Sequence, residues 1–158
     1  MSIEKVRSYF RPLGREQDIL EFPVSSATVE LAAQAVGVIP ARIAKTLSFL
    51  VEDGCVLIVT AGDARIDNSK YKAMFHTKAK MLTAEQVSEF TGHAIGGVCP
   101  FANPEGVRTY LDVSLKRFDT VFPAAGSSNS AIELTCDELT LYSQCLDWID
   151  VCKGWQED

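Results

Sequence analysis

The sequence predicts an α+β fold in a single domain, and three observations support this prediction. The chain has 158 residues, which is the usual length of one domain. Helical stripes and β-rich runs both occur but do not alternate regularly, which disfavours a parallel doubly wound sheet. Two β-rich runs are separated by Asp53-Gly54, a dipeptide typical of tight hairpins, so part of the sheet is expected to be antiparallel.

The N-terminal residues predict a short helix followed by a short strand. Ile3, Val6 and Phe10 recur at helical spacing, and Gly14 lies where this helix is expected to end. Residues 18–23 then favour a strand.

A stronger helix and a hairpin follow. An apolar stripe over 29–36 ends at Gly37, a residue that suits the left-handed end of a helix. A proline then suits the first turn of a brief helix over 41–44. The strands of the hairpin are expected over 46–52 and 55–61.

The middle of the chain carries two helix-start signals. Asn68 or Ser69 can cap a helix that runs to about residue 76. Thr83 and Gln86 have the spacing of a capping box, which predicts a further helix closed by a glycine.

The C-terminal part predicts short strands around one capped helix. Thr135 and Glu138 form another capping box, for a helix that ends near Cys145. The strands are expected over 107–113, 120–125, 131–134 and 148–152. Residues 154–158 are expected to form a frayed tail.

Composition excludes several classes of protein. The hydrophobic content of 47% and charged content of 23% are ordinary for a soluble globular protein. No apolar run is long enough for a membrane span, and the N-terminus lacks the apolar region of a signal peptide. The five cysteines show no CxxC spacing and the two histidines lie far apart, so we expect a reduced cytoplasmic protein with no metal and no cofactor.

Three segments carry residues suited to a binding or catalytic site. Gly96-Gly97-Val98-Cys99-Pro100 is a turn poor in side chains, whose N–H groups can point at a ligand oxygen. Lys45 opens an apolar run, where it either extends its ammonium to water or lies at the wall of a cleft. The third segment, 124–134, is a loop of small polar residues that leads into a strand. Taken alone, the turn favours a structural loop and Lys45 favours extension to water, whereas the third segment is equally compatible with a polar turn and a binding loop.

Together, in this order and spacing, the three segments resemble the YbaK-type family of aminoacyl-tRNA deacylases, a domain also inserted in many bacterial prolyl-tRNA synthetases for editing. The resemblance covers roughly residues 25–139. It implies a mixed, barrel-like β-sheet surrounded by helices, with residues 1–158 forming one domain of this type.

The resemblance also implies roles for particular residues. Lys45 matches the hallmark lysine of the family, with an electrostatic role, and the N–H groups of Gly96 and Gly97 would hold the ester carbonyl or a water. Cys99 lacks a histidine partner in any motif, so a wall residue is favoured over a nucleophile. The expected substrate-binding residues are Thr28, Thr46, Val98, Cys99, Pro100, Gly126, Ser127 and Ser128.

The net charge of −6 disfavours a broad phosphate-binding surface. Residues 62–80 are locally basic, however, with five basic and two acidic side chains. Two interpretations stay open: a solvated helix face, or a small contact for the RNA acceptor end. The lysines concerned are Lys70, Lys72, Lys78 and Lys80.

These expectations define the predicted function. A domain of 158 residues leaves no room for a synthetase catalytic domain, so we expect an editing hydrolase acting in trans on tRNA(Pro) charged with Ala, Ser or Cys. Ala131 stands where cysteine-clearing relatives carry an acid, which weakens the case for cysteine. The partners expected are the acceptor end of a mischarged tRNA and a synthetase. The alternatives are a binding module without turnover and an unrelated α+β domain that shares these turns by chance.

Overall fold

The computed structural model describes residues 2–93 and 97–155. Their centre is a mixed β-sheet of six strands in the order β8-β6-β2-β3-β5-β9. The strands are β2 (Ile43–Val51), β3 (Gly54–Ala61), β5 (Arg108–Asp112), β6 (Thr120–Pro123), β8 (Leu134–Thr135) and β9 (Asp147–Ile149). The β2–β3 and β6–β8 pairs are antiparallel, whereas β2–β6, β3–β5 and β5–β9 are parallel.

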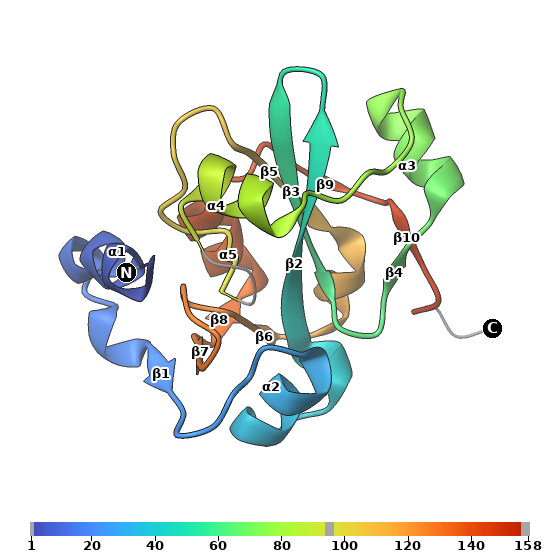
Figure 1. Cartoon of the computed structure of the whole chain (residues 1–158). Coiled ribbons are helices and arrows are strands. Elements are labelled where there is room, and N and C mark those ends of the chain that lie inside the picture. Colours follow the sequence, from blue (N-terminus) through green and yellow to red (C-terminus); the bar gives the residue numbers. More distant parts are fainter. Residues whose placement is uncertain (1, 94–96, 156–158) are drawn as a thin grey trace.

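Two short antiparallel ribbons extend this sheet into a half-open barrel (Figure 1). One joins β1 (Leu20–Glu21) to β7 (Ser130–Ala131), and the other joins β4 (Arg65–Ile66) to β10 (Cys152–Lys153). The predicted α+β class with a mixed, barrel-like sheet and surrounding helices is therefore confirmed.

Helices surround the barrel, and local sequence signals set most of their ends. The α-helices of the described residues are α1 (Ser2–Phe10), α2 (Val29–Val36), α3 (Asn68–Phe75), α4 (Ala84–Thr91) and α5 (Cys136–Ser143). Both predicted capping boxes form, at the starts of α4 and α5. Gly37 ends α2 in the left-handed conformation, with φ of 76°.

Short 3₁₀ helices connect several of these elements: η1 (Arg11–Leu13), η2 (Glu16–Asp18), η3 (Pro40–Arg42) and η4 (Val113–Arg117). No helix in the described ranges is long and apolar enough to cross a bilayer.

Five predicted boundaries are wrong. The brief helix expected over 41–44 is η3, and Ala44 belongs to β2 because it pairs with Ala61 of β3 and with Pro123 of β6. The strand expected over 18–23 shrinks to β1. The strands expected over 131–134 and 148–152 each divide between two different partners.

The fifth error concerns the N-cap of α3. This cap is Asp67, not Asn68 or Ser69, because its carboxylate accepts hydrogen bonds from the N–H groups of Ser69 and Lys70.

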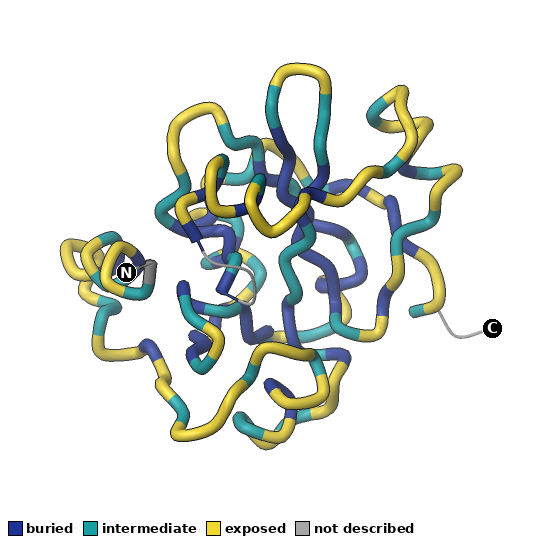
Figure 2. The backbone as a smooth tube through the Cα atoms, in the orientation of Figure 1, coloured by how far each residue is buried: buried dark blue, intermediate teal, exposed yellow. Residues whose placement is uncertain are grey.

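The core lies along β3, which is buried at every position after Gly54 (Figure 2). Val6 and Phe10 attach α1 to this core, and Phe10 makes an edge contact with Phe101 at 4.9 Å between ring centroids. The burial of β3 on both faces fixes the hairpin register, which in turn positions every residue of β2.

Candidate functional site

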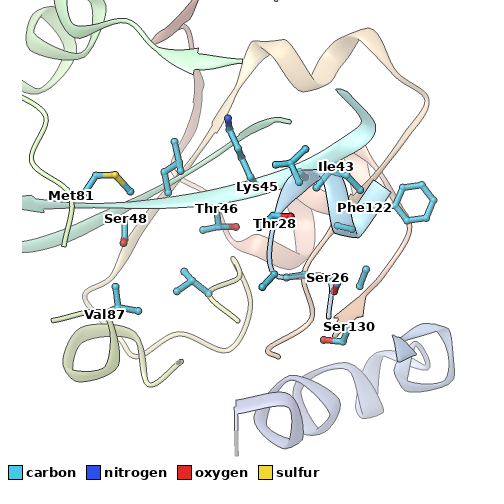
Figure 3. A pocket seen from close by; sticks show the side chains of 18 of the residues that line it. Ser26, Thr28, Ile43, Lys45, Thr46, Ser48, Met81, Val87, Phe122 and Ser130 are labelled. Carbon is cyan, nitrogen blue, oxygen red and sulfur yellow. The ribbon is translucent and has the colours of Figure 1, made fainter. Parts of the chain in front are cut away.

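A cavity of about 310 Å³ lies beside the middle of β2, between α2, α4 and the strand β6 (Figure 3). Hydroxyl side chains and apolar side chains both line it. Its lining residues include Ser26, Thr28, Val29, Ile43, Lys45, Thr46, Leu47, Ser48, Met81, Val87, Val98, Phe122, Ala124 and Ser130. Consecutive residues of β2 line the cavity because it follows the edge of that strand rather than one of its faces.

This edge of β2 is open over a short stretch. Ala44 pairs with Pro123 of β6, and further along Ser48 O accepts a hydrogen bond from the N–H of Leu82. Leu50 N–H donates to Lys80 O on the same side. Backbone groups of alternate residues in an antiparallel pair point the same way, so the N–H and C=O of Thr46 also point to this edge. The described residues contain no backbone partner for them there.

The side chain of Thr46 adds a third unpaired polar group. Its Oγ1 is buried and has no hydrogen-bond partner among the described residues. Figure 3 shows Thr46 and Ser48 on one face of β2, with Val87 on the same side. Because a buried polar group without a partner is costly, this grouping is typical of a place where a ligand completes the hydrogen bonds.

Thr28 lies across the cavity from β2 and is anchored by its capping role. Its Oγ1 accepts a hydrogen bond from the N–H of Leu31 at 3.2 Å, which makes it the N-cap of α2. The expected pocket residue Thr28 therefore lines the cavity and also fixes the start of the helix beside it.

The ammonium of Lys45 is held at the end of the sheet, on the other face of β2 from Thr46 (Figure 3). Nζ donates to Ala64 O at 2.5 Å and lies 3.5 Å from Gly62 O. Burial lowers the pKa of this half-buried amine. The aliphatic stem of Lys45 thus borders the cavity, while its charge rests on backbone carbonyls.

Gly62 sets the position of the loop that holds this ammonium. A Cβ on Gly62 would lie 2.1 Å from Pro40 O, so only glycine permits this close approach. The loop that binds Lys45 is thereby locked against η3.

The turn of the glycines packs against the small-residue loop. A Cβ on Gly97 would lie 3.0 Å from the Cα of Ser127 and 3.1 Å from the carbonyl of Gly126. Within this turn, Val98 lines the cavity, whereas Cys99 and Pro100 are buried behind it. Gly96 lies outside the described residues.

Cys99 is buried in contact with a histidine that sequence reasoning did not connect to it. Its Sγ lies 3.6 Å from Nε2 of His93, and that nitrogen lies 3.1 Å from Phe101 O. Burial raises the pKa of the Cys99 thiol to about 12 and lowers the pKa of His93. A fully buried thiol held neutral in this way is a poor nucleophile.

The loop 126–130 is attached to the segment before α2. Ser26 N–H donates to Ser128 O at 2.6 Å, and Asn129 Nδ2 donates to Phe22 O at 3.0 Å. The Ser127 hydroxyl donates within the loop, to Asn129 Oδ1 at 2.9 Å or Ser130 Oγ at 2.7 Å. Ser130 lines the cavity, whereas Gly126, Ser127 and Ser128 are not part of its lining, and Ser128 is exposed.

The lysines expected to contact RNA differ in their surroundings. Lys70 has a structural role, since its Nζ donates to Asp150 Oδ1 at 2.9 Å and to Cys152 O at 3.0 Å. Lys72, Lys78 and Lys80 are exposed, and none of them forms an ion pair within the described residues.

Sequence reasoning missed several wall residues, namely Ser26, Ser48, Met81, Val87, Phe122 and Ser130. Ser48 could have been found, because it follows Thr46 at the two-residue period of a strand. The others reach the cavity from distant elements. No group of potential metal ligands occurs among residues 2–93 and 97–155.

Comparisons with known proteins agree on the kind of domain that contains this cavity. The family model described as an aminoacyl-tRNA editing domain matches residues 24–141. The uncharacterized protein YwhH of Bacillus subtilis (strain 168) is 57% identical over 157 residues, covering 99% of this chain and all of that protein. The proline–tRNA ligase of Leuconostoc citreum (strain KM20) is 30% identical over 102 residues, which are 64% of this chain but 18% of the ligase.

Solved structures share the fold over nearly the whole chain. A crystal structure of a candidate trans-editing enzyme for prolyl-tRNA synthetase matches with a TM-score of 0.86 and 31% identity, over 97% of this chain and 98% of that one. The crystal structure of hypothetical protein APE2540 matches with a TM-score of 0.82 and 28% identity, over 94% and 99%.

Proposed function

Because this chain belongs to the aminoacyl-tRNA editing domain family, we propose that it hydrolyses the ester of mischarged tRNA, acting in trans on tRNA(Pro) carrying Ala, Ser or Cys. The observation that carries this proposal is the cavity beside the open edge of β2, where Thr46 presents a backbone N–H, a C=O and an unpaired hydroxyl. The likeness to a candidate trans-editing enzyme for prolyl-tRNA synthetase, over 97% of this chain and 98% of that one, supports action in trans on tRNA(Pro).

The size of the cavity supports a small amino acid. Its volume of about 310 Å³ is at the lower end of the range for ligand sites. Val87, Val98 and Ala124 supply apolar wall, so larger side chains would be excluded by contact. Apolar walls separate side chains that differ by one methylene only about 10- to 200-fold, so activity on more than one small amino acid is expected.

The edge of β2 suits the two polar groups of an aminoacyl ester. In our proposal Thr46 N–H donates to the ester carbonyl oxygen, where negative charge develops, and Thr46 C=O accepts from the α-ammonium. A fixed donor of this kind acts more strongly on the oxyanion than on the ground-state carbonyl. The Gly97–Pro100 turn and the Gly126–Ser128 loop, which pack against each other, then keep the cavity in shape.

Water supplies the nucleophile in this scheme, and the 2′-hydroxyl of the substrate can relay a proton from it. The water oxygen adds to the carbonyl carbon, and the bond to the 3′ oxygen then breaks as that oxygen takes up the proton that the water has lost, which releases the free amino acid and the tRNA. Lys45 contributes positive charge near the reacting ester or the terminal phosphate, for which its ammonium must leave Ala64 O. An activated ester needs only orientation and a few preorganised donors.

The partners proposed are the acceptor end of the tRNA and a synthetase. A chain of net charge −6 is expected to bind RNA weakly by itself, so a synthetase bound to the same tRNA would raise the local concentration of substrate.

The test is deacylation of Ala-, Ser-, Cys- and Pro-charged tRNA(Pro) by the wild-type protein and the variants Lys45→Ala and Thr46→Pro. Thr46→Pro removes the edge N–H, and we expect both variants to lose about 100- to 1,000-fold in kcat. The matched control is Lys153→Ala, which removes an exposed charge from β10. Full activity of Lys45→Ala, with circular dichroism showing both variants folded, would refute the role of the lysine.

A second candidate function is a binding module of the same fold without turnover. The observation that favours it is the resting place of the Lys45 ammonium, on Ala64 O rather than in the cavity. Stabilisation by a non-hydrolysable aminoacyl-adenosine, with no release of amino acid from any charged tRNA, would favour this alternative.

A further inference from the structure

The segment 78–82, between α3 and α4, runs antiparallel beside the edge of β2 as a single extended stretch. Lys80 O accepts from Leu50 N–H at 2.8 Å, Leu82 N–H donates to Ser48 O at 3.1 Å, and Met81 forms an isolated bridge with Phe49. These bonds fix the segment against the sheet. It forms one wall of the cavity described above and also one wall of a second hollow.

Met81 is on the cavity side of this segment. The residue is 58% exposed, although it lines the cavity, and Figure 3 shows it at one end of the lining residues. A large exposed apolar side chain at the mouth of a polar-edged cavity is suited to the face of a nucleobase, since a thioether packs well on aromatic rings.

Lys78 and Lys80 are on the other side. They line a wide groove of about 1,030 Å³ between the tip of the β2–β3 hairpin and the end of α3. The carboxylate of Asp53 in this groove is paired with Arg108 at 2.8 Å, which leaves Glu52 as the acid that opposes the two lysines. The groove is therefore locally basic on an acidic protein.

We propose that the segment 78–82 seats the 3′ end of the RNA, with Met81 packing on the terminal base and Lys78 and Lys80 binding backbone phosphates. This inference rests on the proposed function, because the ester must reach the cavity while the strand that carries it continues outside. The two features lie on adjacent residues, so one strand can contact both. Lysines in an open groove act as point charges on phosphates and carry no sequence preference.

The test uses an uncharged RNA hairpin that copies the tRNA(Pro) acceptor stem and ends in CCA, with binding followed by fluorescence anisotropy at several salt concentrations. The double variant Lys78→Ala/Lys80→Ala should lower the slope of log K against log salt by about 1.5, the loss of two phosphate contacts. The control Lys116→Ala/Lys153→Ala removes the same charge from other exposed positions and should keep the wild-type slope.

Met81 is tested with two hairpins, one complete and one without its terminal adenosine. Met81→Ala should weaken binding of the complete hairpin about fivefold, the low end of base-stacking contributions, and leave the shortened hairpin unaffected. Equal loss for both hairpins would overturn the assignment of Met81 to the terminal base.

Failure of this inference is distinguishable from failure of the proposed function. If the wild-type protein deacylates tRNA but the double variant binds the hairpin with the wild-type slope, the seat on segment 78–82 is wrong and the function stands. If no charged tRNA is deacylated but hairpin binding depends on Lys78 and Lys80, the RNA surface stands and the hydrolase is wrong. If the wild-type protein does not bind the hairpin at all, the inference is wrong, and a protein partner becomes the occupant to test for the groove.

Discussion

Gly97→Ala tests whether the glycine turn and the small-residue loop support each other. The backbone of Gly97 does not have positive φ, so the added methyl group meets a problem of space alone. Its Cβ would lie 3.0 Å from the Cα of Ser127, about 0.4 Å inside an ordinary van der Waals contact. The loop cannot retreat freely, because Ser128 O is bonded to Ser26 N–H on its far side.

The expected cost follows from this overpacking. Inserting a methyl group into a tightly packed site costs about 1–3 kcal/mol. For a protein of this length each kcal/mol lowers Tm by about 2–4 °C, so Tm should fall by about 2–12 °C. The displaced turn would also move Val98 in the cavity wall, and kcat/KM for the preferred charged tRNA should fall with it.

Urea and thermal unfolding of Gly97→Ala would be measured beside Ser128→Ala, an exposed change on the same loop expected to stay within about 0.5 kcal/mol of the wild type. The cost should shrink by at least about 0.5 kcal/mol in the background Asn129→Ala, which removes the bond to Phe22 O and lets the loop yield. If Gly97→Ala keeps the stability and activity of the wild type, the overpacking argument is wrong. If the effects of Gly97→Ala and Asn129→Ala on the free energy of unfolding are strictly additive, the bonds that hold the loop to the segment before α2 do not limit its movement.

Three further predictions concern titratable groups. Burial lowers the pKa of Lys45 below 10.5, so the unfolded protein binds more protons than the folded protein between the folded pKa and 10.5. The free energy of unfolding of the wild type, measured in urea, should therefore rise from pH 8 to 10 relative to that of Lys45→Met. A difference between the two proteins that stays constant over this range would contradict the prediction. Burial lowers the pKa of His93 below 6.5 in the folded state, so the free energy of unfolding should decrease as pH falls from 6.5 to 5. His93→Gln should show a smaller decrease when unfolding in urea is measured at the two pH values. Cys99, with its pKa raised to about 12, should resist alkylation in the native protein, and Cys99→Ala should keep deacylation within a few-fold, whereas abolished activity in a folded variant would restore it as a nucleophile.

Local signals predicted the helices well because their causes are local. The capping box of Thr83 and Gln86 places both partners within one turn, so the sequence contains all the information needed. The Asp53-Gly54 hairpin is similar, since two residues determine the turn and the flanking strands follow.

The wrong boundaries have distant causes. Ala44 joins β2 because it pairs with Ala61 of β3 on one side and with β6, nearly 80 residues later, on the other, and no pattern near Ala44 contains the second pairing. The stretch 131–134 was expected as one strand, but Ile132 N–H donates to Pro123 O and the chain passes there from the β1 ribbon to the main sheet. Asp67 is the exception, because its capping role is local and was obscured by two equally good caps after it.

The candidate site shows the same division. The resemblance selected Lys45 and Thr46, and the structure places both beside the cavity. The direction of the Lys45 ammonium depends on Ala64 O in a loop whose path is set by Gly62 against Pro40, which the sequence pattern does not reveal. The open edge at Thr46 likewise depends on where β6 stops, a property of the assembled sheet.

The open stretch of β2 also bears on how this protein avoids aggregation with other copies of itself. An unpaired strand edge invites a strand from another molecule and so promotes aggregation. Here β6 covers the edge up to Ala44, and the segment 78–82 covers it from Ser48 onward. This leaves a gap of about three residues, or roughly 10 Å. A gap so short cannot accept a β-strand of ordinary length. The covering elements therefore act as a size filter: the same backbone groups stay available to a small molecule and closed to a polypeptide.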